Sequence, residues 1–233
     1  VDLSRRTEGA EPVRFVSHCP ACGTPLVRVE GEAAWVCPNR YGCPPQQIGR
    51  IEHFVGRRMM DIDGIGEEMS RELFERGYIR NIADLYSLKA DDIISIPGSG
   101  PRTAQRILDG VEASKKVGFD RVVYALSIPQ VGETVSKHLA RAVGDIDRLM
   151  SMSEAELTAI NDIGPGIAAS VTDYFSHAVN REIIERLREA GVTMAMKRDD
   201  SVERSTRLEG KSIVVSGVFS LHSRDEYKEM LEN

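Results

Sequence analysis

A short glycine-bearing break recurs four times in the middle of this sequence, at an almost constant interval. The breaks read IDGIG (62–66), IPGSG (96–100), IPQVG (128–132) and INDIG (160–164). Their last glycines are 34, 32 and 32 residues apart, and a period of this size is typical of a repeated supersecondary unit. Helix-forming segments follow each break, so the sequence predicts four units of helix, tight hairpin and helix.

Apolar side chains recur at helical spacing around these breaks. The stretch QQIGRIEHFVGRRMM (46–60) places on one face Ile48, Ile51, Phe54 and Val55. The stretch TAQRILDGVEASKK (103–116) places on one face Ala104, Ile107, Leu108 and Val111. Ser153 and Glu156 have the spacing of a capping box that opens a further helix. Residues 46–193 are therefore expected to form a tandem helix-hairpin-helix domain.

Each break could hold an anion without a cationic surface. Glycine has no Cβ, so a phosphate can approach the backbone closely. The first amides of the following helix are unpaired and carry the positive end of the helix dipole. This chemistry predicts sequence-independent binding to DNA phosphates. The residues expected at that interface are Gly64, Gly66, Gly98, Gly100, Arg102, Gly132, Lys137, Gly164 and Gly166.

The four breaks are not equivalent. The first two contain both glycines, whereas Gln130 and Asp162 replace the first glycine in the third and fourth. An acid repels a phosphate, so we expect the third or fourth hairpin to be mainly structural or to bind differently. The alternative for every break is that its glycines only turn the chain between packed helices.

All four cysteines lie in one short stretch, as C-x2-C, a gap of 14 residues and C-x5-C. Two close pairs separated by a hairpin suit tetrahedral zinc, and four thiolates leave no open position, so a structural ion is expected. The predicted ligands are Cys19, Cys22, Cys37 and Cys43. Redox chemistry or free thiols are the alternative. Within this module (18–45), the stretch LVRVEGEAAWVC (26–37) predicts two short strands around Gly31, with a small apolar face.

The total charge excludes a uniformly basic nucleic-acid binder. The chain has 233 residues and a formal net charge of −6, but the hairpin mechanism needs few cationic side chains, and local patches act within about 10 Å. No apolar run approaches the roughly 20 residues of a membrane helix. We expect a monomeric cytoplasmic protein with no membrane partner.

The two ends differ from the helical region. The chain starts with Val rather than Met, and residues 1–17 read as the tail of a preceding domain. Residues 194–207 are polar and charged, as in a linker. In the segment 208–233, KSIVVSGVF (211–219) predicts a buried strand, and a capping box at Ser223 predicts a helix after it. The expected fold is mainly α: a zinc module, four hairpin units and a truncated βα start.

This order of parts resembles the C-terminal half of bacterial NAD-dependent DNA ligases. The resemblance is carried by CPACGTPLVRVEGEAAWVCPN (19–39), CPPQQIGRIEHFVGRRMMDIDGIGE (43–67), ALSIPQVGETVSKHLA (125–140) and LEGKSIVVSGVFSLHSRDEYKEMLE (208–232). It implies that residues 1–17 end an OB-fold domain and that 208–233 begin a BRCT domain. The second cysteine pair is one residue longer than in many members of the family, with Gly42 as the extra residue.

The resemblance also implies an activity for the parent protein. Such ligases transfer AMP from NAD to a lysine and then to the 5′-phosphate of a DNA nick, which they seal in replication and repair. That lysine lies in a K-x-D-G motif of an adenylation domain, and KADD (89–92) does not fit it. The chain is therefore expected to grip nicked duplex DNA and to be inactive alone, with the NAD and Mg²⁺ sites elsewhere.

Three other interpretations remain open. The chain could be the DNA-binding module of another repair protein, such as an excision nuclease, although that would not predict the zinc module or the BRCT-like segment. It could be a protein-interaction scaffold, which would have no salt-sensitive affinity for duplex DNA. An independent enzyme is the third, and no catalytic constellation in the sequence favours it.

Overall fold

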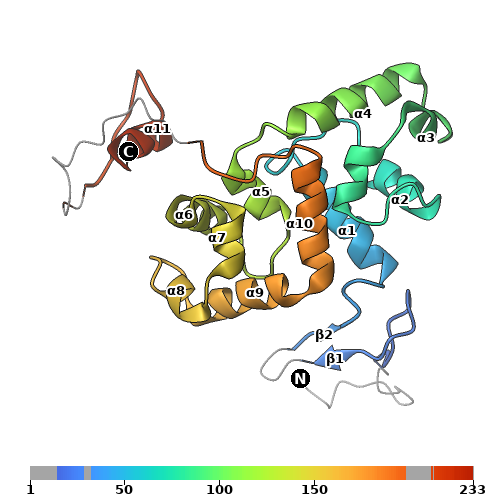
Figure 1. The fold of residues 1–233 in the computed structure, drawn as a ribbon, viewed down its shortest axis with the longest axis horizontal. Coiled ribbons are helices and arrows are strands. Elements are labelled where there is room, and N and C mark those ends of the chain that lie inside the picture. Colours follow the sequence, from blue (N-terminus) through green and yellow to red (C-terminus); the bar gives the residue numbers. More distant parts are fainter. Residues whose placement is uncertain (1–14, 29–32, 198–210, 212, 233) are drawn as a thin grey trace, which may run out of the picture. The chain divides into compact units, whose positions relative to one another are not determined.

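The computed structural model describes residues 15–28, 33–197, 211 and 213–232. The chain forms two compact units, Val1–Met196 and Lys197–Asn233. Most of the described first unit is helical, with one small sheet near its start (Figure 1). Among the described residues, no helix is both long and apolar enough to cross a membrane.

The elements follow one another in a simple order. The strands are β1 (Val27–Arg28) and β2 (Trp35–Val36). The helices of the first unit are α1 (Pro44–Val55), α2 (Glu67–Glu75), the 3-10 helix η2 (Ile82–Ser87), α3 (Ala90–Ile94), α4 (Pro101–Ser114), α5 (Phe119–Ala125), α6 (Glu133–Val143), α7 (Ile146–Ser151), α8 (Glu154–Thr158), α9 (Pro165–Ser176) and α10 (Ala178–Glu189). The second unit contains α11 (Arg224–Glu232).

Each glycine-bearing break lies between two helices that pack against each other. We call these breaks hairpins 1 to 4: residues 62–66, 96–100, 128–132 and 160–164. Their flanking pairs are α1 with α2, α3 with α4, α5 with α6, and α8 with α9. The prediction of four helix-hairpin-helix units is therefore confirmed.

One continuous hydrophobic core holds the four units together. It runs from Ile51 on α1 to Val192 after α10 and includes the apolar faces predicted for α1 and α4. The hairpins are anchored in it by their first and fourth residues, such as Ile62 and Ile65, which are 2% and 5% exposed. Hairpin 2 departs from this pattern because Ser99 stands at its fourth position. Because apolar residues near both ends of a hairpin are buried, the middle of the turn is held at the surface.

Several helix starts are set by local hydrogen bonds. The predicted capping box of α8 is present, with the Glu156 amide donating to Ser153 Oγ (3.3 Å) and the Ser153 amide donating to Glu156 Oε2 (2.8 Å). A second capping box joins Asn81 and Asp84 at η2. These bonds satisfy amides that a helix leaves unpaired at its first turn.

The helix α10 ties the first two hairpin units to the last two. It packs against η2 and against α9, as Figure 1 shows. Arg186 on α10 forms an ion pair with Asp84 on η2 at 2.7 Å. A second link runs from α1 to α5, where the ring of His53 contacts the backbone oxygen of Tyr124 at 3.0 Å. The two halves of the helical domain are thus joined by polar contacts as well as by the core.

The zinc module contacts the last hairpin unit as well as α1. Tyr41 Oη accepts a hydrogen bond from Asn180 Nδ2 on α10 (2.8 Å), and Arg40 lies 3.6 Å from the carboxylate of Asp173 on α9. Asn180 is 2% exposed, so its bond to Tyr41 is shielded from water. The module is therefore attached at two places far apart in the sequence.

The second unit only partly matches the expected βα start. The helix α11 is present, and the amide of Glu226 donates to Ser223 Oγ at its start (3.2 Å), as the capping box predicts. The strand expected over 211–219 is wrong for the described residues 213–219, which form no strand, and Val214 is 83% exposed. A strand needs a neighbour to satisfy its amides and carbonyls, and no other strand of this unit is described.

Candidate zinc and DNA-binding sites

The four cysteines converge on one point. All four sulfurs lie within 4.8 Å of one another, with 3.8 Å between Cys19 and Cys43 and 3.5 Å between Cys22 and Cys37. Four thiolates around Zn²⁺ at about 2.3 Å would place their sulfurs about 3.8 Å apart. The arrangement therefore fits a tetrahedral zinc ion with a closed shell. His18 is outside this cluster, and its ring contacts Ser17 Oγ (3.0 Å).

The backbone shows how the longer second cysteine pair reaches the metal site. Gly42 donates its amide to the side chain of Asn39 (2.9 Å), and the amide of Cys43 donates to the Asn39 carbonyl (3.1 Å). A Cβ at position 42 would lie 2.6 Å from Asn39 Oδ1. A larger residue would displace the Asn39 side chain, so glycine allows Asn39 to close the turn that absorbs the extra residue. Cys43 then caps α1, which starts at Pro44.

The thiols differ in their affinity for protons. Hydrogen bonds with Thr24 lower the pKa of Cys22 to about 6. Loss of solvation raises the pKa of Cys37 to about 12 and also raises that of Cys43. A bound zinc ion deprotonates coordinating thiols outright, so metal uptake here would release protons.

The strand pair carries the expected small apolar face beside the metal site, but this face is largely exposed. β1 and β2 are antiparallel, with Val27 opposite Val36 and Arg28 opposite Trp35. Val27, Val36 and Trp35 are 44%, 40% and 52% exposed. Gly31 and Val29, which belonged to the same prediction, lie outside the described residues. With so little buried surface, a zinc ion bound to the four cysteines would be the main source of stability for this module.

All four hairpins make the same turn at their third residue. The φ angle there is +91° at Gly64, +82° at Gly98, +64° at Gln130 and +65° at Asp162. Only glycine adopts this left-handed conformation without strain, and Asp is among the side chains that tolerate it best. Hairpins 3 and 4 therefore keep the same turn without the first glycine. They differ from hairpins 1 and 2 in carrying a side chain at this position, Gln130 or Asp162.

The last residue of each hairpin is a glycine that faces open space. A Cβ built at any of them would meet no atom within 4 Å, and their φ values are negative. Each one is the N-cap of the following helix, and none of the four helices has a side chain that caps it. These N-caps are Gly66, Gly100, Gly132 and Gly164. The amides at these helix starts are thus accessible to an anion from outside.

Two of the predicted interface glycines face protein instead. A Cβ at Gly64 would lie 2.8 Å from Ile107 and 3.2 Å from Arg106 on α4. A Cβ at Gly166 would lie 3.0 Å from Gln130 Oε1 of hairpin 3. Gly64 allows hairpin 1 to pack closely on α4, whereas a Cβ at Gly166 would require the Gln130 side chain to move. Gly98, by contrast, has open space around it.

Charged side chains distinguish the four helix starts. Acidic residues follow hairpins 1 and 3, including Glu67 and Glu133 in the first turns of α2 and α6. Hairpin 4 carries the exposed Asp162. The first turn of α4, after hairpin 2, contains no acid and has the exposed Arg102. Hairpin 2 therefore offers the strongest field for a phosphate.

A basic cavity beside hairpin 3 escaped the sequence interpretation. It has a volume of about 350 Å³, and its cationic lining consists of Arg57, Arg58, Arg121 and Lys137. Arg121 Nη2 donates to the backbone oxygen of Arg57 (2.6 Å), while its buried Nε has no partner among the described residues. The adjacent arginines at 57 and 58 could have indicated a basic patch from the sequence. Only the tertiary structure places Arg121 of α5 beside them.

The lining of this basic cavity also includes two acids, Asp120 and Glu133, and Glu133 partly neutralises it. The Glu133 carboxylate lies 3.1 Å from Lys137 Nζ and 3.4 Å from Arg58. These contacts, that with Lys137 first, lower the pKa of Glu133. Its charge also lies in the first turn of α6, where a phosphate at hairpin 3 would sit. Glu133 thus competes with an external anion for both the cations and the helix start.

A four-thiolate site beside tandem hairpins with open helix starts defines a zinc-containing protein of the helix-hairpin-helix class. Comparison with known families agrees with this class. The NAD-dependent DNA ligase C4 zinc finger domain matches residues 18–44, a SAM-like helix-hairpin-helix tandem matches 56–113, and a helix-hairpin-helix motif matches 121–184.

Over its whole length the chain is similar to bacterial DNA ligases. DNA ligases from Phocaeicola vulgatus and Bacteroides fragilis are 49% and 45% identical to it over 232 residues, which is 100% of this chain. The DNA ligase of Porphyromonas gingivalis is 47% identical over 233 residues. The chain spans about a third of the length of these relatives, 35%, 35% and 34% respectively.

Proposed function

We propose that this chain is the part of an NAD-dependent DNA ligase that grips duplex DNA. The observation that carries the proposal is the open N-cap glycine at each of the four hairpins, with no side chain over the helix start. Backbone amides at such positions bind phosphate oxygens whatever the base sequence. The substrate we assign is a nicked duplex, in agreement with the name of the relatives.

The four hairpins would share this work unequally. Hairpin 2 is the main contact, because Arg102 adds a charge and no acid follows its glycine. Hairpin 3 acts together with the basic cavity, so that Lys137 and Arg58 reach a neighbouring phosphate. Hairpins 1 and 4 make weaker contacts because Glu67 and Asp162 repel the DNA backbone.

The remaining parts have supporting roles in this proposal. The zinc module (18–45) is structural and joins the helical domain (46–193) to a preceding OB-fold domain. A linker (194–207) leads to the start of a BRCT domain (208–233). AMP transfer, with its NAD and Mg²⁺, belongs to an adenylation domain, and the chain alone would not seal nicks. The protein would act as a cytoplasmic, nucleoid-associated monomer in DNA replication and repair.

The N-cap glycines allow a direct test, because the fold can accept a methyl group there. Gly100→Ala and Gly132→Ala each place a Cβ in open space at an unstrained φ, but in the path of a phosphate. Gly49→Ala, on α1, adds a methyl group to equally open space and serves as the control. Affinity for a nicked duplex is measured by fluorescence anisotropy at two salt concentrations.

We expect Gly100→Ala to weaken binding about tenfold, the equivalent of one charge-assisted hydrogen bond, with a smaller loss for Gly132→Ala. Wild-type affinity should fall steeply with salt because each phosphate contact releases counterions. Gly49→Ala should bind like the wild type. Salt-independent binding, or equal affinity for all four proteins, would contradict the hairpin mechanism and favour a protein-interaction scaffold.

A further inference from the structure

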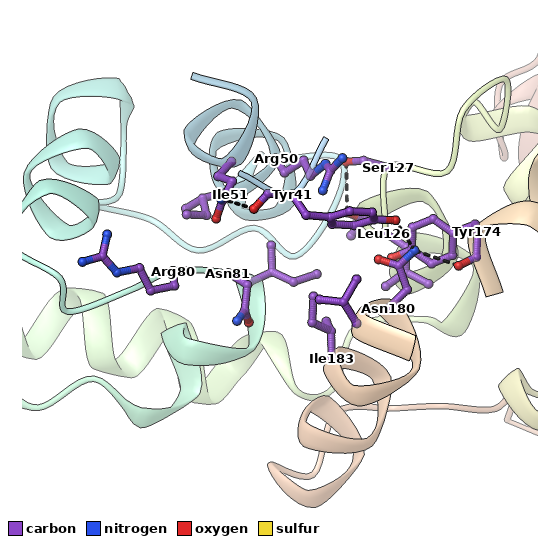
Figure 2. A pocket seen from close by; sticks show the side chains of 14 residues that line it. Tyr41, Arg50, Ile51, Arg80, Asn81, Leu126, Ser127, Tyr174, Asn180 and Ile183 are labelled. Atoms are coloured by element: carbon purple, nitrogen blue, oxygen red, sulfur yellow. Dashed lines mark hydrogen bonds between the residues drawn. The ribbon is translucent and has the colours of Figure 1, made fainter. Parts of the chain in front are cut away.

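A second cavity lies where the zinc module and both halves of the helical domain meet. Its volume is about 320 Å³, at the small end of the range for ligand pockets. Tyr41 comes from the zinc module, Arg50 from α1, Ile82 from η2, Leu126 from the end of α5 and Asn180 from α10. Figure 2 shows the side chains of Tyr41, Arg50, Leu126 and Asn180 around one space. It is separate from the hairpin turns and from the four cysteines.

Asn180 places a free hydrogen-bond acceptor in this cavity. Its Nδ2 donates to the backbone oxygen of Tyr174 (2.7 Å) and to Tyr41 Oη (2.8 Å). A carbonyl can only accept, so the nitrogen must face Tyr174, and both amide protons are used. No hydrogen bond to the Oδ1 atom is present among the described residues, and this atom is not fully buried, so it borders the cavity. An acceptor at the wall of the cavity can accept a hydrogen bond from a ligand with an N–H or O–H group.

Cationic charge lines the same cavity without a carboxylate to balance it. The guanidinium of Arg50 stacks over the Tyr41 ring at 5.0 Å and forms no ion pair among the described residues. Arg80 also contributes to the wall, but its guanidinium contacts Phe74 and points away from the space in Figure 2. No Asp or Glu is among the lining residues that the structure describes. The cavity therefore favours an anion near Arg50.

The rest of the wall is apolar and aromatic. Ile51, Ile82 and Leu126 line the cavity and are buried. The rings of Tyr41 and Tyr174 line the same space (Figure 2). Burial raises the pKa of Tyr174, so its hydroxyl stays protonated and can donate to a bound anion. Tyrosine rings pack best against other flat aromatic groups.

We propose that this cavity is a binding site for a small planar aromatic anion, such as an aromatic carboxylate. Its ring would lie between the apolar wall and the tyrosines, its charge would meet Arg50, and a donor group would reach Asn180 Oδ1. Because the walls come from the zinc module and both halves of the helical domain, the bound ligand would stabilise their arrangement. The site does not depend on the proposed role in DNA binding.

The test uses two probes of equal shape, 6-hydroxy-2-naphthoate and the uncharged 6-hydroxy-2-naphthamide, whose hydroxyl group can donate to Asn180 Oδ1. Each is titrated into the full chain and followed by NMR. Val179, on the rim of the cavity, is 38% exposed, and Val179→Trp should block entry. Ile94 is also 38% exposed but does not line the cavity, so Ile94→Trp is the matched control. Arg50→Gln removes the charge alone.

We expect saturable binding of naphthoate to the wild type and to Ile94→Trp, and none to Val179→Trp. Arg50→Gln should weaken naphthoate about tenfold and leave naphthamide unchanged. In the wild type, the side-chain amide signal of Asn180 should shift, while that of the exposed Asn161 should not, and this measurement holds even if Val179→Trp fails to fold. Absence of saturable binding, an unmoved Asn180 signal, or equal naphthoate affinity in Arg50→Gln would overturn the proposal.

Discussion

The Nδ1 atom of His138 lies 3.2 Å from Oδ2 of Asp162. The helix after hairpin 3 therefore contacts the turn of hairpin 4. The reverse contact also exists, because Gln130 Nε2 in hairpin 3 donates to Ser170 Oγ on α9 (3.2 Å). Each helix residue stands six positions after the last glycine of its own hairpin. Hairpins 3 and 4 thus form an interlocked pair with nearly equivalent contacts in both directions.

The first two hairpins show part of the same arrangement. Arg106 stands six positions after Gly100, and its Nε lies 3.7 Å from the carboxylate of Asp63 in hairpin 1. Gly64 and Gly110 both allow hairpin 1 to approach α4 closely. The four units are therefore arranged as two pairs, each with a turn packed against the helix of its partner.

Asp162 should weaken DNA binding at hairpin 4. Replacing it by Asn removes the negative charge but keeps a side chain that tolerates the φ of +65°. We expect Asp162→Asn to raise duplex affinity about twofold at low salt, with a smaller gain at high salt because of screening. Asp109→Asn on α4, where Gln105 donates to the carboxylate (2.8 Å), is the control for a lost surface charge. Weaker binding by Asp162→Asn would show that its contact with His138 matters more than its repulsion.

The basic cavity at hairpin 3 makes opposite predictions for two neighbouring residues. Lys137→Gln should weaken binding to all duplex sequences alike and reduce the salt dependence by about one counterion. Glu133→Gln should strengthen binding, since it releases Lys137 and Arg58 and removes an acid from the first turn of α6. Anisotropy titrations over a salt series measure both effects. Lys116→Gln, at an exposed lysine just beyond α4, is the control. If the cavity binds DNA, this change should alter neither the duplex affinity nor its salt dependence.

Zinc removal should unfold the zinc module and leave the helical domain largely intact. The chain has one tryptophan, Trp35, and it lies on β2 beside the metal site, whereas the hydrophobic core begins at Ile51. A chelator should therefore change Trp35 fluorescence but preserve most of the helical circular dichroism. Elemental analysis should give about one zinc per chain before chelation. Loss of the helical signal together with the metal would mean that the core depends on zinc as well.

The capping box of α8 predicts a change in stability at acid pH. Hydrogen bonds from Ser153, first from its hydroxyl (2.7 Å) and then from its amide (2.8 Å), lower the pKa of Glu156. A lowered pKa means that this stabilisation is present above the unfolded value of about 4.3 and is lost as the pH falls through the folded value. Melting temperatures of the wild type and Glu156→Gln should differ at neutral pH and converge below about pH 4. A constant difference across this range would rule out ionisation as its source.

Local structure followed the sequence closely in the hairpins and in the cysteine cluster. Ile62 and Ile65 are buried where the hairpin pattern places them, and the capping box at Ser153 is present. These features depend on residues a few positions apart, so short-range sterics and hydrogen bonds are sufficient to specify them. The strand expected after Lys211 failed for a related reason, since a strand also needs a partner that its own residues do not supply.

By itself, the sequence determined the helical class, the four turns, the four metal ligands and the chemistry that open helix starts offer to phosphate. Only the tertiary structure decided that Gly64 serves packing, that Arg121 joins Arg57 beside hairpin 3, and that Asn180 meets Tyr41 across 139 positions of the chain. The physical reason is distance along the chain. Turn and cap preferences act between neighbouring residues, whereas a cavity forms only when the core has brought separate helices into contact.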